Sequence, residues 1–309
     1  MKLLPRAYSG EADKKRMASL AQAFPARHLH TVDLPYRLSS WGLDVPENTR
    51  LWETTKGELK GWAALQPPFW TIDYACHPEA ASELFAEMLA WADPLAEEII
   101  ESPYGHPAWY VNVFASQAEH IRVLEEAGFT DQGDMGEDSW SKVLMQRDAQ
   151  DSLRQYPIPT GFVVRLLAGE SEVEAYVALH QMVFETKNMT VEWRSRTLQH
   201  PAYTPDLDIV VAASDGRLGA FCIGWLMRGV GGDLIGQIEP LGCHPDFRRY
   251  ALGRLALAEV LRRMQALGVS SILVETDNDR KTALALYESL GFQVIQDVRV
   301  FRKNYGGPV

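Results

Sequence analysis

The stretch Glu239–Arg254 constrains this chain of 309 residues most, because it joins an apolar strand to an amphipathic helix through a turn rich in arginine and small residues. Arg248 and Arg249 stand in the turn, and Ala251 and Gly253 follow them. Small residues let the backbone point several N–H groups at one place, and a helix that begins there adds the positive end of its dipole. Arginine adds planar donors that suit phosphate oxygens. The stretch therefore predicts an anion site, although an ordinary strand–turn–helix corner with surface arginines has the same pattern.

Two segments of the second half resemble a known family. His-Pro-Asp-Phe-Arg-Arg-Tyr-Ala-Leu-Gly, residues 244–253, resembles motif A of the GCN5-related N-acetyltransferases (GNAT), which is written Q/R-x-x-G-x-G/A. Further along, Ala-Leu-Ala-Leu-Tyr-Glu-Ser-Leu-Gly-Phe, residues 283–292, resembles their motif B. The first glycine of motif A is Ala251 here, which costs about 1 kcal/mol if the position needs a positive φ and nothing if it lies in the first helical turn. The resemblance covers roughly residues 160–309.

The order of predicted elements repeats along the chain. Each half reads as a strand, helices, a three-strand meander, a helix, a strand, a further helix and closing strands. His77-Pro78 before a helix in the first half matches His244-Pro245 in the second, and a polar, proline-containing stretch separates the halves. We therefore expect an α+β (mixed α/β) protein with two GNAT-like domains, residues 1–148 and 160–309. Each is expected to be a mostly antiparallel twisted sheet flanked by helices.

Three local expectations concern where elements begin and end. Pro94 lies where the helix that begins at Glu79 is expected to end. Ser171, with Glu174 three residues later, fits a capping box at the start of a helix. Residues 292–295 and 298–301 are expected to form a final pair of strands.

Charge and composition limit the class of protein. A net charge of −11 argues against general nucleic-acid binding. Residues 1–150 hold 13 Lys/Arg and 23 Asp/Glu, whereas residues 151–309 hold 17 and 18. An anionic cofactor is therefore expected to bind to the second half. The acidic first half could attract a cationic amine, or its charge could serve only solubility. No apolar run reaches the roughly 18 residues of a membrane helix and the N-terminus has no apolar leader, so we expect a cytoplasmic protein, monomeric or homodimeric.

The three cysteines are Cys76, Cys222 and Cys243, and no C-x-x-C occurs. Each stands in or beside an apolar segment, which favours buried free thiols over a disulfide or a metal site. We therefore expect no bound metal.

The resemblance implies acetyl-CoA as the acetyl donor. At matching positions, Leu241, Gly242 and Cys243 would offer backbone groups to the pantetheine arm and the thioester carbonyl. Relatives often have an asparagine seven residues before the tyrosine of motif B, where this chain has Arg280, so Asn278 becomes the candidate for that contact. The pyrophosphate would be held by the turn and the start of the helix, which comprise Arg248, Arg249, Tyr250, Ala251, Leu252, Gly253 and Arg254.

Acetyl transfer to an ammonium group needs a base, and the leaving thiolate needs an acid. Tyr287 holds the tyrosine position of motif B and is the candidate acid, although a half-buried tyrosine anchored by one hydrogen bond is the alternative. Glu239 and Glu275 are the candidate bases, because a carboxylate in an apolar strand has a raised pKa when it faces a dry cleft. Either one can instead face solvent, and Glu239 is slightly preferred.

The first half lacks this chemistry. Where the second half has its arginines, the first has Glu79 and Glu83 near a helix start, and these carboxylates would repel a pyrophosphate. We expect this half to shape the substrate cleft or the domain interface, or to be a purely structural partner.

The resulting expectation is an N-acetyltransferase that moves an acetyl group from acetyl-CoA to a primary amine of a small molecule by direct attack. Tandem domains of this kind also resemble mycothiol synthase-like proteins, whose acceptor is a cysteinyl amino sugar. The alternative is a non-catalytic protein that binds acyl-CoA or another partner and retains the GNAT fold.

Overall fold

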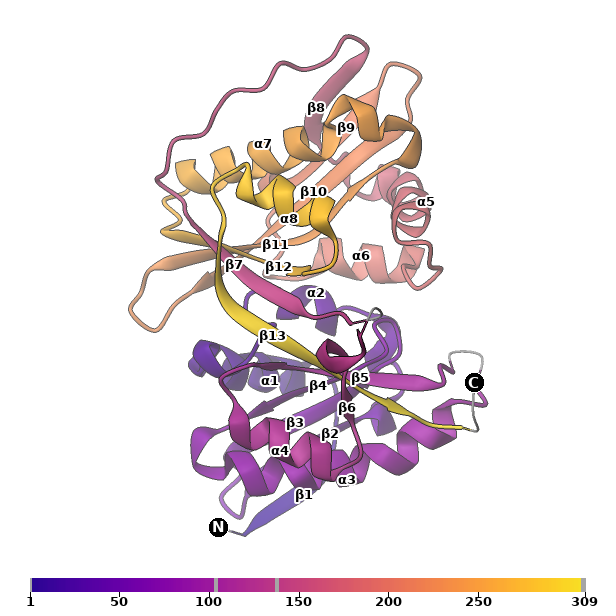
Figure 1. Cartoon of the computed structure of the whole chain (residues 1–309), viewed down its shortest axis with the longest axis vertical. Helices are drawn as coiled ribbons and strands as arrows, with labels where there is room; N and C mark the ends of the chain where they lie inside the picture. Colours follow the sequence, from indigo (N-terminus) through magenta and orange to yellow (C-terminus); the bar gives the residue numbers. More distant parts are fainter. Residues whose placement is uncertain (1, 103–104, 137–138, 307–309) are drawn as a thin grey trace.

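The first half of the chain forms the lower lobe in Figure 1. The computed structural model describes residues 2–102, 105–136 and 139–306. Strands whose residues alternate between buried and partly exposed positions follow the period-two pattern of the sequence. The elements of this half are β1 Leu3–Ala7, α1 Glu11–Ala23, α2 Leu34–Leu38, β2 Thr49–Thr54, β3 Leu59–Gln66, β4 Thr71–Cys76, α3 Ala81–Ile99, β5 Ala108–Phe114, α4 Ala118–Glu126, β6 Thr130–Asp131 and β7 Lys142–Asp148.

The second half forms the upper lobe and repeats this order of elements. The polar stretch 149–161, which is described throughout, contains neither helix nor strand. After it come β8 Phe162–Leu166, α5 Val173–Phe184, α6 Val191–Gln199, β9 Asp208–Ala213, β10 Leu218–Arg228, β11 Leu234–Cys243, α7 Leu252–Ala266, β12 Ser271–Asp277, α8 Lys281–Glu288 and β13 Gln293–Asn304.

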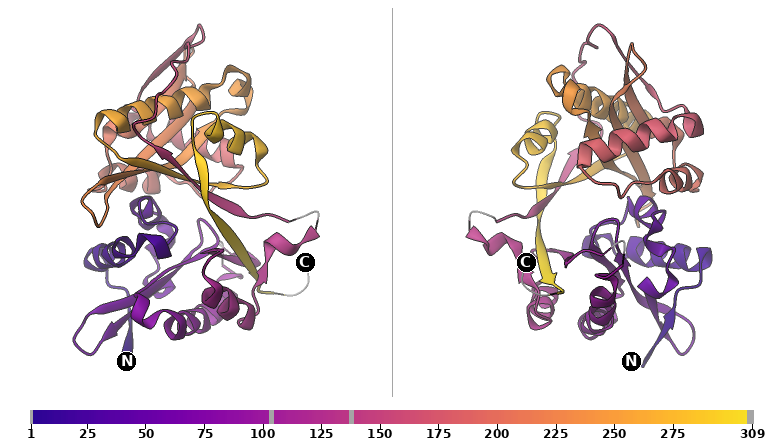
Figure 2. Two further views of the ribbon diagram at one scale, coloured as in Figure 1. Left: turned by 60° about the vertical axis from the view of Figure 1, so that its left-hand side comes forward. Right: turned by 90° about the vertical axis from the view of Figure 1, so that its right-hand side faces the viewer.

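One continuous sheet runs through both lobes, in the order β1-β2-β3-β4-β5-β13-β7-β12-β11-β10-β9-β8, with β6 paired to β13. The halves exchange their last strands. β7 of the first half pairs antiparallel with β12, and β13 of the second half pairs antiparallel with β5 and β7. Figures 1 and 2 show these two strands crossing from lobe to lobe. A domain boundary between residues 148 and 160 stays a prediction, because the sheet itself continues across the junction.

Helix α7 packs on the sheet of the second half through one apolar face. Val260, Leu261 and Met264 on this face are fully buried. Two strand glycines make room for Met264, since a Cβ at Gly224 or Gly236 would lie within 2.7 Å of it. The close packing of helix and sheet holds the N-terminus of α7 beside the end of β11.

Apolar side chains of both halves also pack together directly. Tyr36 of α2 lies in one buried cluster with Trp193 and Trp225 of the second half, and the Trp193 indole donates to the Tyr36 carbonyl at 3.1 Å. Trp41 donates to the carbonyl of Asn188 across the same interface. Because aromatic residues bury large areas, this contact fixes the two lobes to one another.

Three local expectations are wrong. Helix α3 runs through Pro94 to Ile99, because Ala92 and Ala96 pack in the core on either side of the proline and outweigh one lost hydrogen bond. Residues 293–304 form one strand with a register shift between Val294 and Gln296, since that strand spans both lobes.

The capping box at Ser171 is also absent. Ser171 donates to the Ala168 carbonyl, and α5 begins at Val173 without a side-chain cap. The Glu172 carboxylate takes the capping role in the preceding 3₁₀ turn, where it accepts from the Ala168 N–H at 2.7 Å and pairs with Arg165.

None of the helices in the described ranges is long and apolar enough to cross a membrane.

Candidate active site

The strands β11 and β12 separate at the centre of the second lobe. They pair in parallel only from Ile235 to Ile238, whereas β11 continues along β10 to Cys243. Glu239, Leu241, Gly242 and Cys243 therefore follow the point where β11 leaves β12, and one edge of this segment faces the opening rather than a strand. Backbone groups at such an edge are free to bind a ligand.

The turn after β11 shows whether the position of Ala251 needs a positive φ. His244 Nδ1 accepts from the Asp246 N–H at 3.1 Å and starts a 3₁₀ turn over Pro245–Tyr250. Ala251 then adopts φ 55° and ψ 31°, the left-handed conformation that favours glycine, directly before α7. The position does need a positive φ, so alanine there costs about 1 kcal/mol.

The start of α7 has the features of an anion site. Leu252 is fully buried, and a Cβ at Gly253 would lie 3.7 Å from the Cβ of Cys243, so helix and strand end lie close together. The free N–H groups of the first helical turn lie beside this contact. Arg248, Arg249 and Tyr250 are exposed, and neither of these arginines has an ion pair within the described ranges. Arg254 is partly buried, with its guanidinium 5.6 Å from the centre of the Tyr156 ring.

The cysteines are free thiols, as expected. Cys76 and Cys222 are buried, and burial raises their pKa. Burial also raises the pKa of Cys243, although the Gly253 N–H and Arg248 act in the opposite direction. A protonated thiol is a poor nucleophile, so Cys243 does not suit covalent catalysis.

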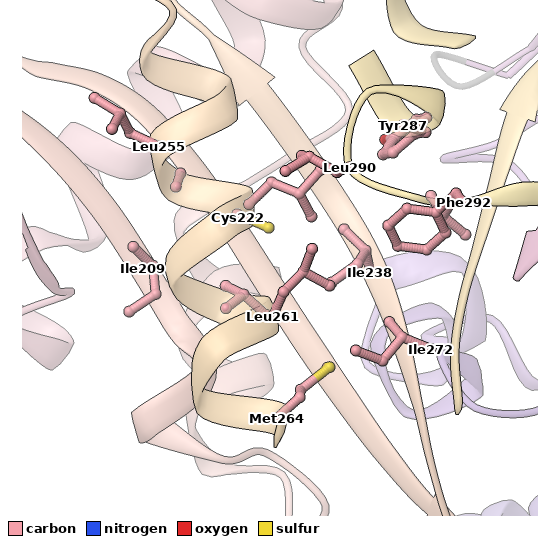
Figure 3. Close-up of a cluster of buried hydrophobic side chains, with 14 of the residues drawn as sticks. Ile209, Cys222, Ile238, Leu255, Leu261, Met264, Ile272, Tyr287, Leu290 and Phe292 are labelled. Atoms are coloured by element: carbon pink, nitrogen blue, oxygen red, sulfur yellow. The ribbon is translucent and has the colours of Figure 1, made fainter. Parts of the chain in front are cut away.

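Tyr287 projects from α8 to the rim of the hydrophobic core (Figure 3). Its ring lies 5.7 Å from that of Phe292, in an edge-to-face arrangement. Burial raises the pKa of Tyr287, and Cys222 and Glu239 add to the effect. The hydroxyl has no hydrogen-bond partner among the described residues.

Glu239 is partly buried, and its carboxylate has no ion pair with the described residues. The Trp225 indole donates to its backbone carbonyl at 2.7 Å and fixes this part of β11. Burial raises the pKa of Glu239 to about 7, with contributions from Asp33 and Glu275, while His30 and Arg37 lower it. A carboxylate that titrates near neutral pH suits a general base.

Glu275 has different surroundings, although it lies on the neighbouring strand β12. Lys142 Nζ of β7 lies 2.6 Å from one of its carboxylate oxygens. Burial opposes ionisation of Glu275, but Lys142, His30 and Arg37 outweigh it and lower its pKa. The expected rise in pKa is therefore found at Glu239 and not at Glu275, because only Glu275 has a cation at hydrogen-bond distance.

Asn278 directly follows β12 and is exposed. Its backbone N–H donates to the Ser141 carbonyl at 2.8 Å, and its side-chain amide lies 3.4 Å from the Ser141 hydroxyl. Arg280 pairs instead with Asp277.

The first half supplies a set of buried polar residues that the sequence analysis missed. His30 Nδ1 lies 3.1 Å from Asp33, and Arg37 makes two 2.8 Å hydrogen bonds with Asp73. His30, Arg37 and Lys142 act on Glu275, whereas His30, Asp33 and Arg37 act on Glu239. The only sequence signal for these residues is the His-x-x-Asp spacing of residues 30–33, and this spacing does not indicate which residues of the second half they contact.

Among the described residues, no group of three or more His, Cys, Asp or Glu side chains is placed to hold a metal ion.

Residues 172–292 match the family model described as "Acetyltransferase (GNAT) family". Over these residues the chain is similar to the GNAT family. They contain the separated strands, the arginine turn with α7, and Tyr287 on α8.

Solved structures extend the likeness to both lobes. The chain aligns along its whole length with a tandem GNAT protein from the clavulanic acid biosynthesis pathway, with a TM-score of 0.64, 12% identity and 100% coverage of each chain. A GCN5-related N-acetyltransferase from Sphaerobacter thermophilus aligns with a TM-score of 0.66 at 18% identity, covering 99% of this chain and 97% of that one. At such identities the likeness shows the fold alone, and this chain shares it over both lobes with the tandem GNAT protein.

Curated relatives include the mycothiol acetyltransferase of Thermomonospora curvata, which is 28% identical over 152 residues. The match covers 48% of this chain and 50% of the relative. The chain thus spans about half the length of the curated relatives it matches.

Proposed function

We propose that this protein is an acyltransferase that moves an acetyl group from acetyl-CoA to a primary amine of a small molecule. The observation that carries the proposal is Glu239, a partly buried carboxylate with a pKa raised to about 7 and no ion pair among the described residues, beside the opening between β11 and β12. A base of this kind takes a proton from an ammonium group at neutral pH.

The residues around α7 fit the donor. Arg248 and Arg249 are exposed without ion pairs in the described ranges, and the helix N-terminus adds free N–H groups. They would hold the pyrophosphate, together with residues 250–254. Leu241, Gly242 and Cys243 would receive the pantetheine arm along the free edge of β11. Acetyl-CoA supplies an activated acetyl thioester, and the backbone N–H groups at this edge would stabilise the charge that develops on its carbonyl oxygen.

The acceptor would enter between the lobes, where Glu239 removes a proton from its ammonium group and the neutral amine then attacks the thioester carbon. Tyr287 would donate its proton to the thiolate that leaves. The raised pKa of Tyr287 keeps the phenol protonated until that charge develops, and its hydroxyl has no competing partner among the described residues. Direct transfer of this kind requires no enzyme nucleophile, in keeping with the protonated Cys243.

We also propose a cytoplasmic protein, monomeric or homodimeric, without a nucleic-acid or membrane partner. The net charge of −11 supports the absence of nucleic acid.

Two measurements test the function. Acetyl-CoA at about 100 times its Kd should stabilise the protein by about 2.7 kcal/mol in a thermal shift assay. A panel of primary amines, followed by the release of free CoA thiol, should then contain acceptors that turn over. Binding without turnover across the panel would favour a non-catalytic acyl-CoA-binding protein, and no shift with acetyl-CoA or CoA would contradict both.

A further inference from the structure

The segment between α1 and α2 of the first half reaches the active site of the second. His30 lies at its centre, with Nδ1 3.1 Å from Asp33 Oδ2 and Nε2 3.5 Å from Glu275 Oε2. The Asp33 side chain is 1% exposed and that of Glu275 is 7% exposed. The imidazole therefore bridges a buried carboxylate of each half.

Three polar atoms at this bridge make no hydrogen bond with the described residues, although two of them, on His30 and Glu275, lie 3.5 Å apart. They are His30 Nε2, Asp33 Oδ1 and Glu275 Oε2, and all three atoms are buried. Buried polar atoms without partners are costly, and native proteins keep few of them without a functional reason. Their concentration around His30 indicates that the segment does more than fill space.

The position of His30 is fixed by the space where β4 and β5 separate, which we call the wedge. It corresponds to the opening between β11 and β12 in the second half. β4 and β5 pair in parallel only at Thr71 and Tyr110. Leu29 fills the wedge by packing with Phe114 and with residues of β7, β12 and β13. The remaining cavity of about 40 Å³ has room for little more than a water molecule.

The backbone of this segment is anchored too, since the Gln117 amide donates to the Arg27 carbonyl at 3.1 Å. The wedge that would hold a cofactor in the first half is thus occupied by the chain itself. That occupation presents His30 to the second half.

We propose that His30, which is held by Asp33 and lies 3.5 Å from Glu275, is a positioning residue for acetyl transfer that the first half contributes, and that its charge acts on the carboxylates beside the opening between β11 and β12. This inference rests on the proposed function, because it assigns His30 to the same site.

The charged groups around His30 and Glu239 determine the direction in which the pKa of each one shifts. His30 faces Arg37, Asp33, Glu275 and Asp73. Burial and Arg37 disfavour its protonation, but Asp33 and Glu275 outweigh them and raise the pKa of His30.

The charges of Asp33 and Glu275 add to the effect of burial on the pKa of Glu239, and those of His30 and Arg37 oppose it. Lys142 neutralises Glu275 from β7. Protonated His30 therefore keeps the pKa of Glu239 lower than burial and the carboxylates alone would set it.

The coupling between His30 and Glu239 can be measured without turnover, because two interacting charges shift the pKa values of one another equally. The ring signals of His30 are titrated by NMR in the wild type and in Glu239→Gln, and identified by their loss in His30→Gln. Removing the Glu239 charge should lower the pKa of His30 by about half a unit or more. The same His30 pKa in both proteins would overturn the inference, whether or not any amine is acetylated.

The pH dependence of kcat/KM provides the second readout. His30→Gln should move the acid limb of this pH profile to higher pH by about one unit. His30→Lys keeps a cation and should leave the acid limb near that of the wild type. His28→Gln is the matched control: burial lowers the pKa of His28 to about 4, so its loss removes no charge at neutral pH. An unshifted limb in a folded His30→Gln protein would contradict the role.

If no amine turns over, the proposed function fails while the NMR titration still decides the coupling. Thermal melting of each variant separates loss of folding from loss of charge.

Discussion

Glu239 and Glu275 lie on neighbouring strands of the second half, yet only Glu275 has a lysine at 2.6 Å. The lysine lies 133 positions earlier in the chain, on a strand of the first half. Strand patterns alone therefore left both glutamates as candidates, and the packing of β7 against β12 distinguishes them.

Glu239→Gln should lower kcat/KM by about 10²- to 10⁴-fold, the usual contribution of a general base. The amide has nearly the same shape but cannot take a proton. Glu275→Gln serves as the comparison, and its main effect should be a lower melting temperature, because Lys142 loses its partner. Similar activity losses in the two variants would contradict the assignment of the base.

Glu239 should also influence stability as a function of pH. Its folded pKa of about 7 lies above the unfolded value of 4.5, so its stabilising contribution is complete below pH 4.5 and is lost as pH rises through 7. Glu239→Gln lacks this loss, and should exceed the wild type in unfolding free energy by roughly 1–2 kcal/mol at pH 8, after allowance for partial exposure. Urea denaturation at pH 5 and pH 8 measures the difference. A constant gap between the two proteins would contradict the raised pKa.

Ala251 offers a test of backbone conformation. Ala251→Gly relieves the positive φ and should leave the unfolding free energy unchanged or raise it by up to about 1 kcal/mol, since glycine also loses more entropy on folding. Ala251→Val should be destabilising, because a β-branched side chain fits this region poorly. Gly253→Ala is the control at a position with space for a Cβ, and thermal melting of the three variants compares them.

At the scale of elements, periodicity predicted nearly all helices and strands, because each element buries one face on the common sheet. The exceptions have particular causes. Packing of Ala92 and Ala96 carries α3 through Pro94, and the Glu172–Arg165 pair displaces the capping box at Ser171. These are contacts between segments, which local patterns do not contain.

Helix α6 is joined to β9 by a fully buried ion pair between Arg194 and Asp208. Tyr203 donates to the same carboxylate at 2.7 Å, and the Arg194 guanidinium lies over the ring of Tyr176. Asp208→Asn should lower the unfolding free energy by about 3–5 kcal/mol, because it leaves a buried cation without its partner.

The double variant Arg194→Met/Asp208→Leu is the matched comparison for this pair. It should lose less stability than Asp208→Asn, since it removes both charges together. Urea unfolding of the three proteins tests the pair, and a loss under about 1 kcal/mol in Asp208→Asn would contradict its importance.

At the scale of the whole molecule, the sequence predicted the duplicated plan and the half that holds the anion turn. It did not predict that β7 and β13 change lobes, because strands on both sides of such an exchange have the same alternation. Lys142 reaches Glu275 through the pairing of β7 with β12, and His30 lies 3.5 Å from the same carboxylate. Their positions depend on pairing between distant segments, which one sequence does not reveal.

The exchanged strands should make the two lobes unfold together. Calorimetry of the intact chain should show a single transition, whereas fragments 1–148 and 160–309 should lack fixed tertiary structure when separate, because each loses a strand pairing and the aromatic interface. Two well-separated transitions, or a fragment with the near-UV circular dichroism of a folded domain, would contradict this expectation.

The pairing of β13 with β5 has a consequence for synthesis of the chain. The ribosome makes residues 108–114 nearly two hundred residues before the strand that covers their edge. Until β13 is made, the first half therefore exposes an open, largely apolar strand edge, which is a site for aggregation or for contact with chaperones.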